Sequence, residues 1–505
     1  MTMLSRVLGL ARDVILARFI GAEANADAFF VAFKIPNFLR RLFAEGAFAQ
    51  AFVPVLSEYR EKGAREAVQG LIDRICGCLG LVLAILTGLA VVGAPLVAAV
   101  FAPGFWDDTQ KFELTGELIR ITFPYLMLIS LTGFAGSILN SYDRFAIPAI
   151  TPVLLNVCLI FAALVASSWF AEPVFALAWG VLVAGVVQLA FQIPFLMRLR
   201  LMPRPKVDWA DPGVKRVLKL MAPAMFGVSV SQINLLFDTV LASFLPTGSI
   251  SWLYYSDRLS ELPLGVFGVA IATVVLPSLS RQHAKMSTES FSQTLDWALR
   301  LVLYIALPAA VALMILAEPI LTTLFQYGAL TAHDVEMAGY SLRAYAFGLT
   351  AFMLIKVLAP GFYARQDVKT PVKIGVIAMA ANMILNLVFV LPLMWWFDLG
   401  HAGLALATAV SAMLNAFLLF LGLRKVGVYL PQAGWGRYFM QQALAVTLMA
   451  VVLLYGLSLF TEWFEWAWWQ RAMHLAALCV AGLVAYLSAL VFSGVRLGQL
   501  RAPSH

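Results

Sequence analysis

The chain has 505 residues, of which 62% are hydrophobic and only 12% are charged, and its mean hydropathy is +0.86. A soluble protein would carry about 25% charged residues, so this composition excludes a chain built of soluble domains. Apolar runs of about 18 residues or more recur to the C-terminus, which indicates a polytopic helical membrane protein. The net charge of +7 is then attributed to loop orientation rather than to nucleic-acid binding.

These runs predict an all-α polytopic membrane protein with fourteen transmembrane helices, near residues 2–21, 26–58, 68–101, 114–140, 145–170, 173–197, 214–245, 250–280, 292–325, 335–362, 370–396, 400–424, 437–460 and 471–494. The second run is too long for one straight crossing, because about 33 residues span about 50 Å and the bilayer core is about 30 Å thick. Pro36, Gly46 and Pro54 are the expected bends. The first helix does not resemble a cleavable signal peptide. It is short at its start, with Arg6 almost at the chain end, which leaves open whether the chain extends upstream of Met1.

Loop charge predicts the orientation. Alternate loops are strongly basic, with Arg60, Lys62, Arg65, Arg144, Arg198, Arg200, Arg204, Lys206, Arg281, Lys285, Arg365, Lys369, Arg424, Lys425, Arg496 and Arg501. The other loops, such as Gly104–Glu113 and Thr461–Trp469, are nearly free of Lys and Arg, and His333 and His401 are expected in two of them. By the positive-inside rule, both termini are cytoplasmic.

An internal repeat divides the chain. Residues Ala44–Ser57 align without gaps with Phe267–Ser280, and Asp13 corresponds to Asp238 at nearly the same offset. Parallel repeats of this kind are typical of transporters that work by alternating access. The sequence therefore predicts two pseudo-symmetric six-helix lobes, 1–200 and 201–430, followed by a C-terminal pair of helices and a short cytoplasmic tail in 431–505.

Charged side chains lie inside apolar helices, where they are costly unless they face a water-filled cavity or a partner. The cations are Arg6, Arg12, Lys34, Arg40, Arg41 and Arg258. Arginine binds phosphate oxygens through a planar fork and stays charged, so an anion site between the lobes is predicted from Arg6, Arg12, Arg40 and Arg258.

A structural explanation competes with the anion site. Arg12 with Asp13, or Arg258 with Glu261, are expected as buried ion pairs under that explanation. For Arg18 the structural explanation is preferred, since it lies at a helix end where it can reach the interface. Among the uncharged polar residues, Asn156, Gln188 and Gln192 are expected to bond between helices.

A second candidate site comprises Asp238, Asn382, Asn386 and Thr408, which are oxygen ligands that suit a small hard cation. Sodium coupling, titration of Asp238 with proton coupling, and direct action of the membrane potential are three open explanations of the driving force. No metal is firmly indicated. The chain has no Walker A sequence and no clustered catalytic residues, so it is interpreted as a transporter rather than an enzyme.

Four segments carry a close family resemblance: Ser5–Asp13, Ala26–Leu56, Tyr254–Ser280 and Lys356–Ile374. They resemble the MurJ (MviN) family of lipid II flippases, within the multidrug/oligosaccharidyl-lipid/polysaccharide exporter superfamily. The resemblance implies transfer of undecaprenyl-pyrophosphoryl-MurNAc-pentapeptide-GlcNAc from the cytoplasmic to the periplasmic leaflet of the bacterial inner membrane, for peptidoglycan synthesis.

By motif position the resemblance implies substrate-binding roles for Arg6, Arg12, Arg40 and Arg258, and further cavity positions at Asp27, Ser251 and Glu261. The implied partners are lipid II, membrane lipids, and cell-wall synthesis and division proteins; no cofactor is implied. A flippase for another polyprenyl-linked glycan and a cation or drug antiporter are the alternatives among transporters. A non-transporting scaffold for cell-wall synthesis is the alternative from another class, and the intramembrane arginines argue against it.

Overall fold

The computed structural model describes residues 2–41, 48–284 and 287–495, and throughout these residues the regular structure is helical. The first residues of the repeated segment, Ala44–Ala47, lie outside the described residues, as do Gly46 and the loop cations Lys285, Arg496 and Arg501. The described chain separates into two compact units, Met1–Ser251 and Trp252–His505.

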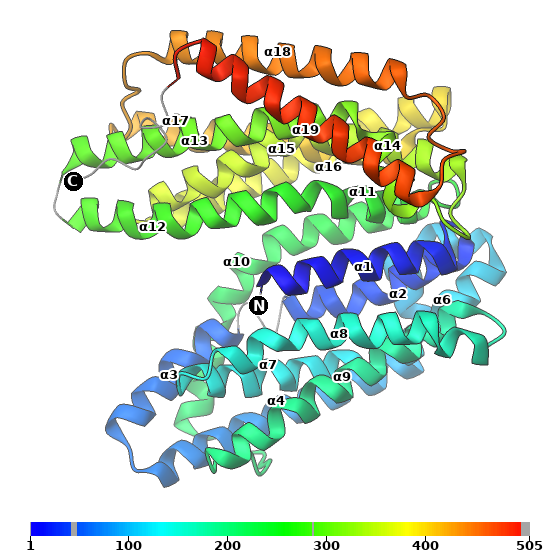
Figure 1. Ribbon diagram of the computed structural model, residues 1–505. Helices are drawn as coiled ribbons and strands as arrows, with labels where there is room; N and C mark the ends of the chain where they lie inside the picture. Colours follow the sequence, from blue (N-terminus) through cyan, green and yellow to red (C-terminus); the bar gives the residue numbers. More distant parts are fainter. Residues whose placement is uncertain (1, 42–47, 285–286, 496–505) are drawn as a thin grey trace. The chain divides into compact units, whose positions relative to one another are not determined.

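The first unit contains α1 to α10 and the start of α11 (Figure 1). Its helices are α1 (Thr2–Ile20), α2 (Ala24–Arg40), α3 (Ala49–Lys62), α4 (Arg65–Val92), α5 (Ala94–Phe101), α6 (Thr109–Thr122), α7 (Tyr125–Ser141), α8 (Ala146–Leu164), α9 (Pro173–Arg198) and α10 (Pro212–Ser243), with short 3₁₀ turns η2 (Pro103–Asp107) and η3 (Ala166–Trp169). Helix α8 packs against α1 and α9, and α2 packs against α6.

The second unit continues α11 and ends with two helices that lie side by side, α18 and α19, drawn in orange and red in Figure 1. Its helices are α11 (Ser249–Pro263), α12 (Val269–Ala284), α13 (Thr288–Ile315), α14 (Ala317–Phe325), α15 (Ala332–Tyr363), α16 (Lys369–Phe397), α17 (Gly400–Lys425), α18 (Trp435–Leu459) and α19 (Trp468–Phe492), with a π-helical turn η4 (Leu264–Gly268) between α11 and α12.

Helix boundaries in the second unit recur 223 residues after those in the first. Helices α4, α5, α6 and α8 begin at Arg65, Ala94, Thr109 and Ala146, and α13, α14, α15 and α16 begin at Thr288, Ala317, Ala332 and Lys369. The sequence repeat has the same offset. The loop before α8 and the loop before α16 also share a left-handed residue, Asp143 (φ 59°) and Gln366 (φ 61°). The two units therefore reuse one succession of helices.

Side-chain caps start several of these helices. The Asp108 carboxylate accepts the backbone N–H of Lys111 at α6, and Asp211 accepts those of Gly213 and Val214 at α10. Thr331 and Asp334 form a reciprocal capping box at α15. Caps of this kind satisfy backbone donors that the first turn leaves without partners, which fixes where each helix begins.

Ten helices of the described residues are long and apolar enough to cross a membrane, or eleven if α11 and α12 form one bent span. The chain is thus an all-helical polytopic membrane protein, as predicted, and the figure of fourteen spans stays a prediction. Helix α1 carries Arg6, Arg12, Asp13 and Arg18, so it is not apolar enough to count. Helix α2 has only 17 residues. Charged helices such as these are the ones that a criterion of plain hydrophobicity misses.

The segment between α9 and α10 is attached to α4. Lys206 donates its backbone N–H to Asp73 O (3.0 Å), and Arg204 donates its N–H to Asp73 Oδ1 (2.8 Å). A Cβ at Gly77 would lie 2.3 Å from Lys206 O, so the close crossing of the two backbones requires glycine at this position. Leu71 of α4 belongs to a buried core that also contains Phe52 and Phe134.

Candidate functional site

The Arg12 side chain is buried in the first unit together with Asp13. Its guanidinium donates to Asp13 Oδ1 from Nε (2.9 Å) and from Nη2 (2.6 Å), and to Asn156 Oδ1 on α8 from Nη1 (3.0 Å). Asn156 in turn donates to Ser5 O (3.1 Å), so it joins α8 to α1. The ion pair expected under the structural explanation is therefore present, and Asn156 bonds between helices as predicted. The same holds for Gln188 and Gln192, which both bond to Thr151.

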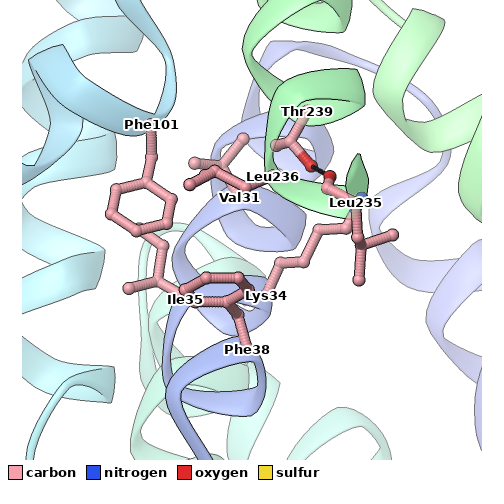
Figure 2. A pocket seen from close by; sticks show the side chains of 8 residues that line it. All are labelled: Val31, Lys34, Ile35, Phe38, Phe101, Leu235, Leu236 and Thr239. Atoms are coloured by element: carbon pink, nitrogen blue, oxygen red, sulfur yellow. Dashed lines mark hydrogen bonds between the residues drawn. The ribbon is translucent and has the colours of Figure 1, made fainter. Parts of the chain in front are cut away.

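Arg6 and Arg40 are both half-buried, in α1 and at the last residue of α2. Arg18 is exposed. Lys34 lies one helical turn and a half before Arg40 and lines a small pocket formed by α2, α5 and α10 (Figure 2). The pocket has a volume of about 220 Å³, including space open to the surroundings, and is lined by Val31, Lys34, Ile35, Phe38, Phe101, Leu235, Leu236 and Thr239. Apart from Lys34 and Thr239 its lining is apolar, so by itself it does not suit a polyanion.

Asp27 of α2 binds the start of α11. Its Oδ1 accepts the backbone N–H (3.0 Å) and the hydroxyl (2.7 Å) of Ser251, and its Oδ2 accepts the N–H of Gly248 (2.8 Å). Lys111 of α6 also contacts this carboxylate, with its Nζ 3.0 Å from Asp27 Oδ2. The same Nζ lies over the ring of Phe105, 4.2 Å from the ring centroid. Asp27, Ser251 and Lys111 are all buried. A carboxylate that accepts this many hydrogen bonds holds a helix N-terminus firmly.

Arg258 and Glu261 lie one turn apart on α11 in the second unit. Arg258 Nη1 is 3.3 Å from Glu261 Oε2, and the two side chains are 34% and 49% exposed. Unlike the Arg12–Asp13 pair, this pair is open to its surroundings. The Arg258 guanidinium is therefore more accessible than that of Arg12.

The four residues of the candidate cation site belong to different units: Asp238 on α10 to the first, and Asn382, Asn386 and Thr408 on α16 and α17 to the second. Asn382 and Asn386 are buried. Ser411 donates to Asn382 Oδ1 (3.2 Å), and the Thr408 hydroxyl donates to Leu404 O (3.0 Å). The bond from Ser411 thus joins α17, which carries Thr408, to α16, which carries Asn382. The four-residue cation site stays a prediction.

The sequence places Lys111 and two histidines in loops, and the structure places all three in helices. Lys111 was assigned to an outer loop, but it is buried in the first turn of α6. The signal was present, because Lys111 is an isolated cation in the set of loops otherwise free of Lys and Arg. The expectation that His333 and His401 lie in loops is wrong, since they are the second residues of α15 and α17, and His401 is fully buried.

Comparisons with known proteins agree with one another. The family model described as "Lipid II flippase MurJ" matches residues 16–470. A protein of Vibrio cholerae named "Probable lipid II flippase MurJ" is 50% identical over 99% of this chain and 96% of its own length. "Lipid II flippase MurJ" of Burkholderia cenocepacia is 44% identical over 98% of this chain and 94% of its own length.

Solved structures give the same result for the fold. A structure described as "Lipid II flippase MurJ, inward closed conformation" superposes with a TM-score of 0.81 at 28% identity, covering 97% of each chain. An inward-facing multidrug resistance MATE family transporter of the MOP superfamily superposes with a TM-score of 0.67 at 16% identity, covering 85% of this chain and 95% of that one. At that identity the second likeness concerns the fold alone.

Proposed function

Because this chain belongs to the MurJ family of lipid II flippases, we propose that it moves lipid II from the cytoplasmic to the periplasmic leaflet of the bacterial inner membrane by alternating access. The cargo is undecaprenyl-pyrophosphoryl-MurNAc-pentapeptide-GlcNAc, which peptidoglycan synthesis consumes outside the membrane. Both termini are cytoplasmic in this proposal, in agreement with the basic loops. The family is one of transporters, not enzymes.

The observation that carries the proposal is a set of arginines on otherwise apolar helices, with Arg258 on α11 34% exposed. Arg6, Arg40 and Arg258 bind the pyrophosphate and sugars in this account, since a pyrophosphate needs several forked donors. Arg12 binds the cargo in this account and also holds α1 against α8, because it already donates three hydrogen bonds to Asp13 and Asn156. Glu261 orients Arg258.

Asp27 and Ser251 act on the helix rather than on the cargo. Both are buried and bonded to each other, so neither is open to a large head group. We assign them to a latch at the start of α11 that must release during the transport cycle. Alternating access needs two states of similar free energy, and a buried hydrogen-bonded latch is suited to stabilise one of them.

The domain proposal is two pseudo-symmetric six-helix lobes, 1–200 and 201–430, and a C-terminal helix pair in 431–505, with fourteen spans in all. The recurrence of helix starts 223 residues apart supports it. The compact units divide the chain at Ser251 instead, which groups α10 with the first unit. A cation or drug antiporter is the less favoured function, because the MATE likeness has only 16% identity.

The proposal is tested by depleting the protein in its host and measuring where lipid II lies. Lipid II should accumulate and escape a membrane-impermeant reagent that reacts with its head group from outside. Re-expression of the native chain should restore labelling, and Arg258→Ala at equal abundance should not. Undiminished outside labelling after depletion would contradict the proposal.

A further inference from the structure

His401 is a fully buried imidazole with only part of its hydrogen-bonding capacity used. Its Nδ1 lies 2.6 Å from the Ser341 hydroxyl of α15. Within the part of the chain that the structure describes, its Nε2 is buried and has no hydrogen-bond partner. Either tautomer satisfies the Ser341 contact, and either one leaves the second ring nitrogen without a partner.

The ring joins the starts of three helices of the second unit. The Trp252 ring of α11 packs edge-on against His401, with centroids 4.9 Å apart, and also meets His333 of α15 at 5.9 Å. Trp252 Nε1 donates to Asp334 Oδ1 (2.9 Å), while Asp334 Oδ2 accepts the N–H (2.8 Å) and hydroxyl (2.7 Å) of Thr331. Trp252 is thus clamped between the first turns of α15 and α17.

The repeat supplies an internal comparison. Ser341 corresponds to Leu118 at the offset of 223 that relates α6 to α15, and His401 corresponds to Val174, since each is the second residue of its helix. Leu118 and Val174 are both buried. The same positions are therefore filled by apolar side chains in the first unit, so this fold does not require a hydroxyl–imidazole pair for its packing.

Among the described residues, no carboxylate is paired with His401. Asp334 is the nearest carboxylate in the cluster, and three donors already occupy it. Glu318 of α14 is paired with Arg343 at 2.6 Å, and Asp398, between α16 and α17, is exposed. The remaining titratable groups on the first turns of α15 are His333, Glu336 and Tyr340. Along α11, the titratable groups after Trp252 are Tyr254, Tyr255 and then Asp257, which lies more than one turn beyond Trp252.

We propose that His401 is a proton-binding site that releases the start of α11: the neutral ring holds Trp252 against α15 and α17, and the protonated ring favours the detached arrangement. A second ring N–H needs an acceptor that the buried site lacks, and a buried charge without a counter-ion is costly. The imidazolium is satisfied once water reaches it. Since a proton shifts an equilibrium only by its differential affinity for two states, acid favours the state in which His401 is hydrated.

The site deepens the proposed function, and its role in transport rests on that proposal. In the proposed topology this end of the second unit faces the periplasm. Trp252 directly follows Ser251, which is bonded to Asp27. Release of Trp252 frees the residues of α11 that directly follow the latch, so acid on the periplasmic side favours movement of α11 beyond Ser251.

The test uses the full chain, purified without lipid II, so that failure of the flippase assignment does not affect it. Backbone hydrogen exchange in Trp252–Arg258 is measured at about pH 4 and about pH 7.5 and corrected for the intrinsic pH dependence of exchange. The corrected rate should rise at least about threefold at the lower pH in the native chain. In His401→Gln it should be independent of pH, whereas His333→Gln should keep the response.

An unchanged corrected rate in the native chain, or a pH response that survives in His401→Gln, would overturn the proposal. Should His401→Gln fail to fold, the native protein still decides, because it has only five histidines whose ring signals can be followed by NMR. The His401 ring is expected to titrate together with the faster exchange at Trp252. A His401 signal that stays neutral throughout this pH range excludes it as the proton site.

Discussion

Lys111 Nζ lies 3.0 Å from Asp27 Oδ2, and both side chains are almost completely buried. The pair joins α6 to α2, and the same carboxylate accepts the backbone N–H groups of Gly248 and Ser251. Removing one member of a buried pair leaves the other as an uncompensated charge, which is more damaging than removing both.

Lys111→Met is therefore expected to destabilise the protein by about 3–5 kcal/mol, and Asp27→Asn/Lys111→Met by clearly less. Thermal unfolding of the purified protein across the double-mutant cycle measures the coupling. Additive effects of the two substitutions would mean that the pair does not act as a unit, and the latch would then rest on Ser251 alone.

Arg258→Ala should reduce flipping at least about tenfold without loss of protein, since one charge-assisted hydrogen bond contributes about 1.5–3 kcal/mol to binding the cargo. Arg258→Lys should recover little of the activity, because a point charge lacks the fork geometry. Arg18→Ala is the matched control, as Arg18 is exposed and expected to be tolerated. Growth of a strain that depends on Arg258→Ala at the native rate would remove Arg258 from the site.

Gly77→Ala should destabilise the first unit, because the added methyl group would lie 2.3 Å from Lys206 O and all three of its close neighbours are backbone atoms of Lys206. The expected cost is about 1–3 kcal/mol, the usual range for overpacking. Gly80→Ala on the same helix is the control, since no atom lies within 4 Å of its added Cβ. Equal unfolding temperatures for the two variants would show that the α9–α10 segment is not held against α4.

Asp238→Asn separates the three explanations of the driving force in proteoliposomes with imposed gradients. Sodium-dependent transport that the substitution abolishes would support a cation site with Asn382, Asn386 and Thr408. Transport that follows a proton gradient and is lost in the variant would indicate titration of Asp238. If transport depends on neither ion gradient and is unchanged in the variant, the membrane potential is the driving force that remains. It acts on the charged cargo with about 2.3 kcal/mol per charge per 100 mV.

The sequence was sufficient for the fold class and the repeat because both depend on patterns that are local. Hydrophobic runs predict helices, and matching Pro and Ser residues in Phe48–Ser57 and Ile271–Ser280 reveal the repeated unit. The breaks inside runs were harder to see. The break between α4 and α5 at Gly93 corresponds to the break between α13 and α14 at Leu316. The break therefore depends on the position in the fold and not on the presence of a glycine.

The site was predictable as a list of residues but not as a set of contacts. Arg12 and Asp13 are adjacent in sequence, so their ion pair was foreseeable, whereas its bond to Asn156 crosses from α1 to α8. The cavity position of Asp27 stays a prediction, whereas its bonds to Lys111 and Ser251 come from distant segments and could not be foreseen. Spacing along one helix gives a face, and it cannot say which other helix covers that face.

Reconstitution of the purified chain tests the central claim most directly. Proteoliposomes carrying labelled lipid II in both leaflets are treated with a membrane-impermeant quencher, and the protected fraction is followed with time. The account predicts that the native protein makes the protected pool accessible, and that Arg258→Ala, at equal density and with intact folding, leaves that pool protected. Equal accessibility with the native protein, with Arg258→Ala and with protein-free vesicles would contradict it.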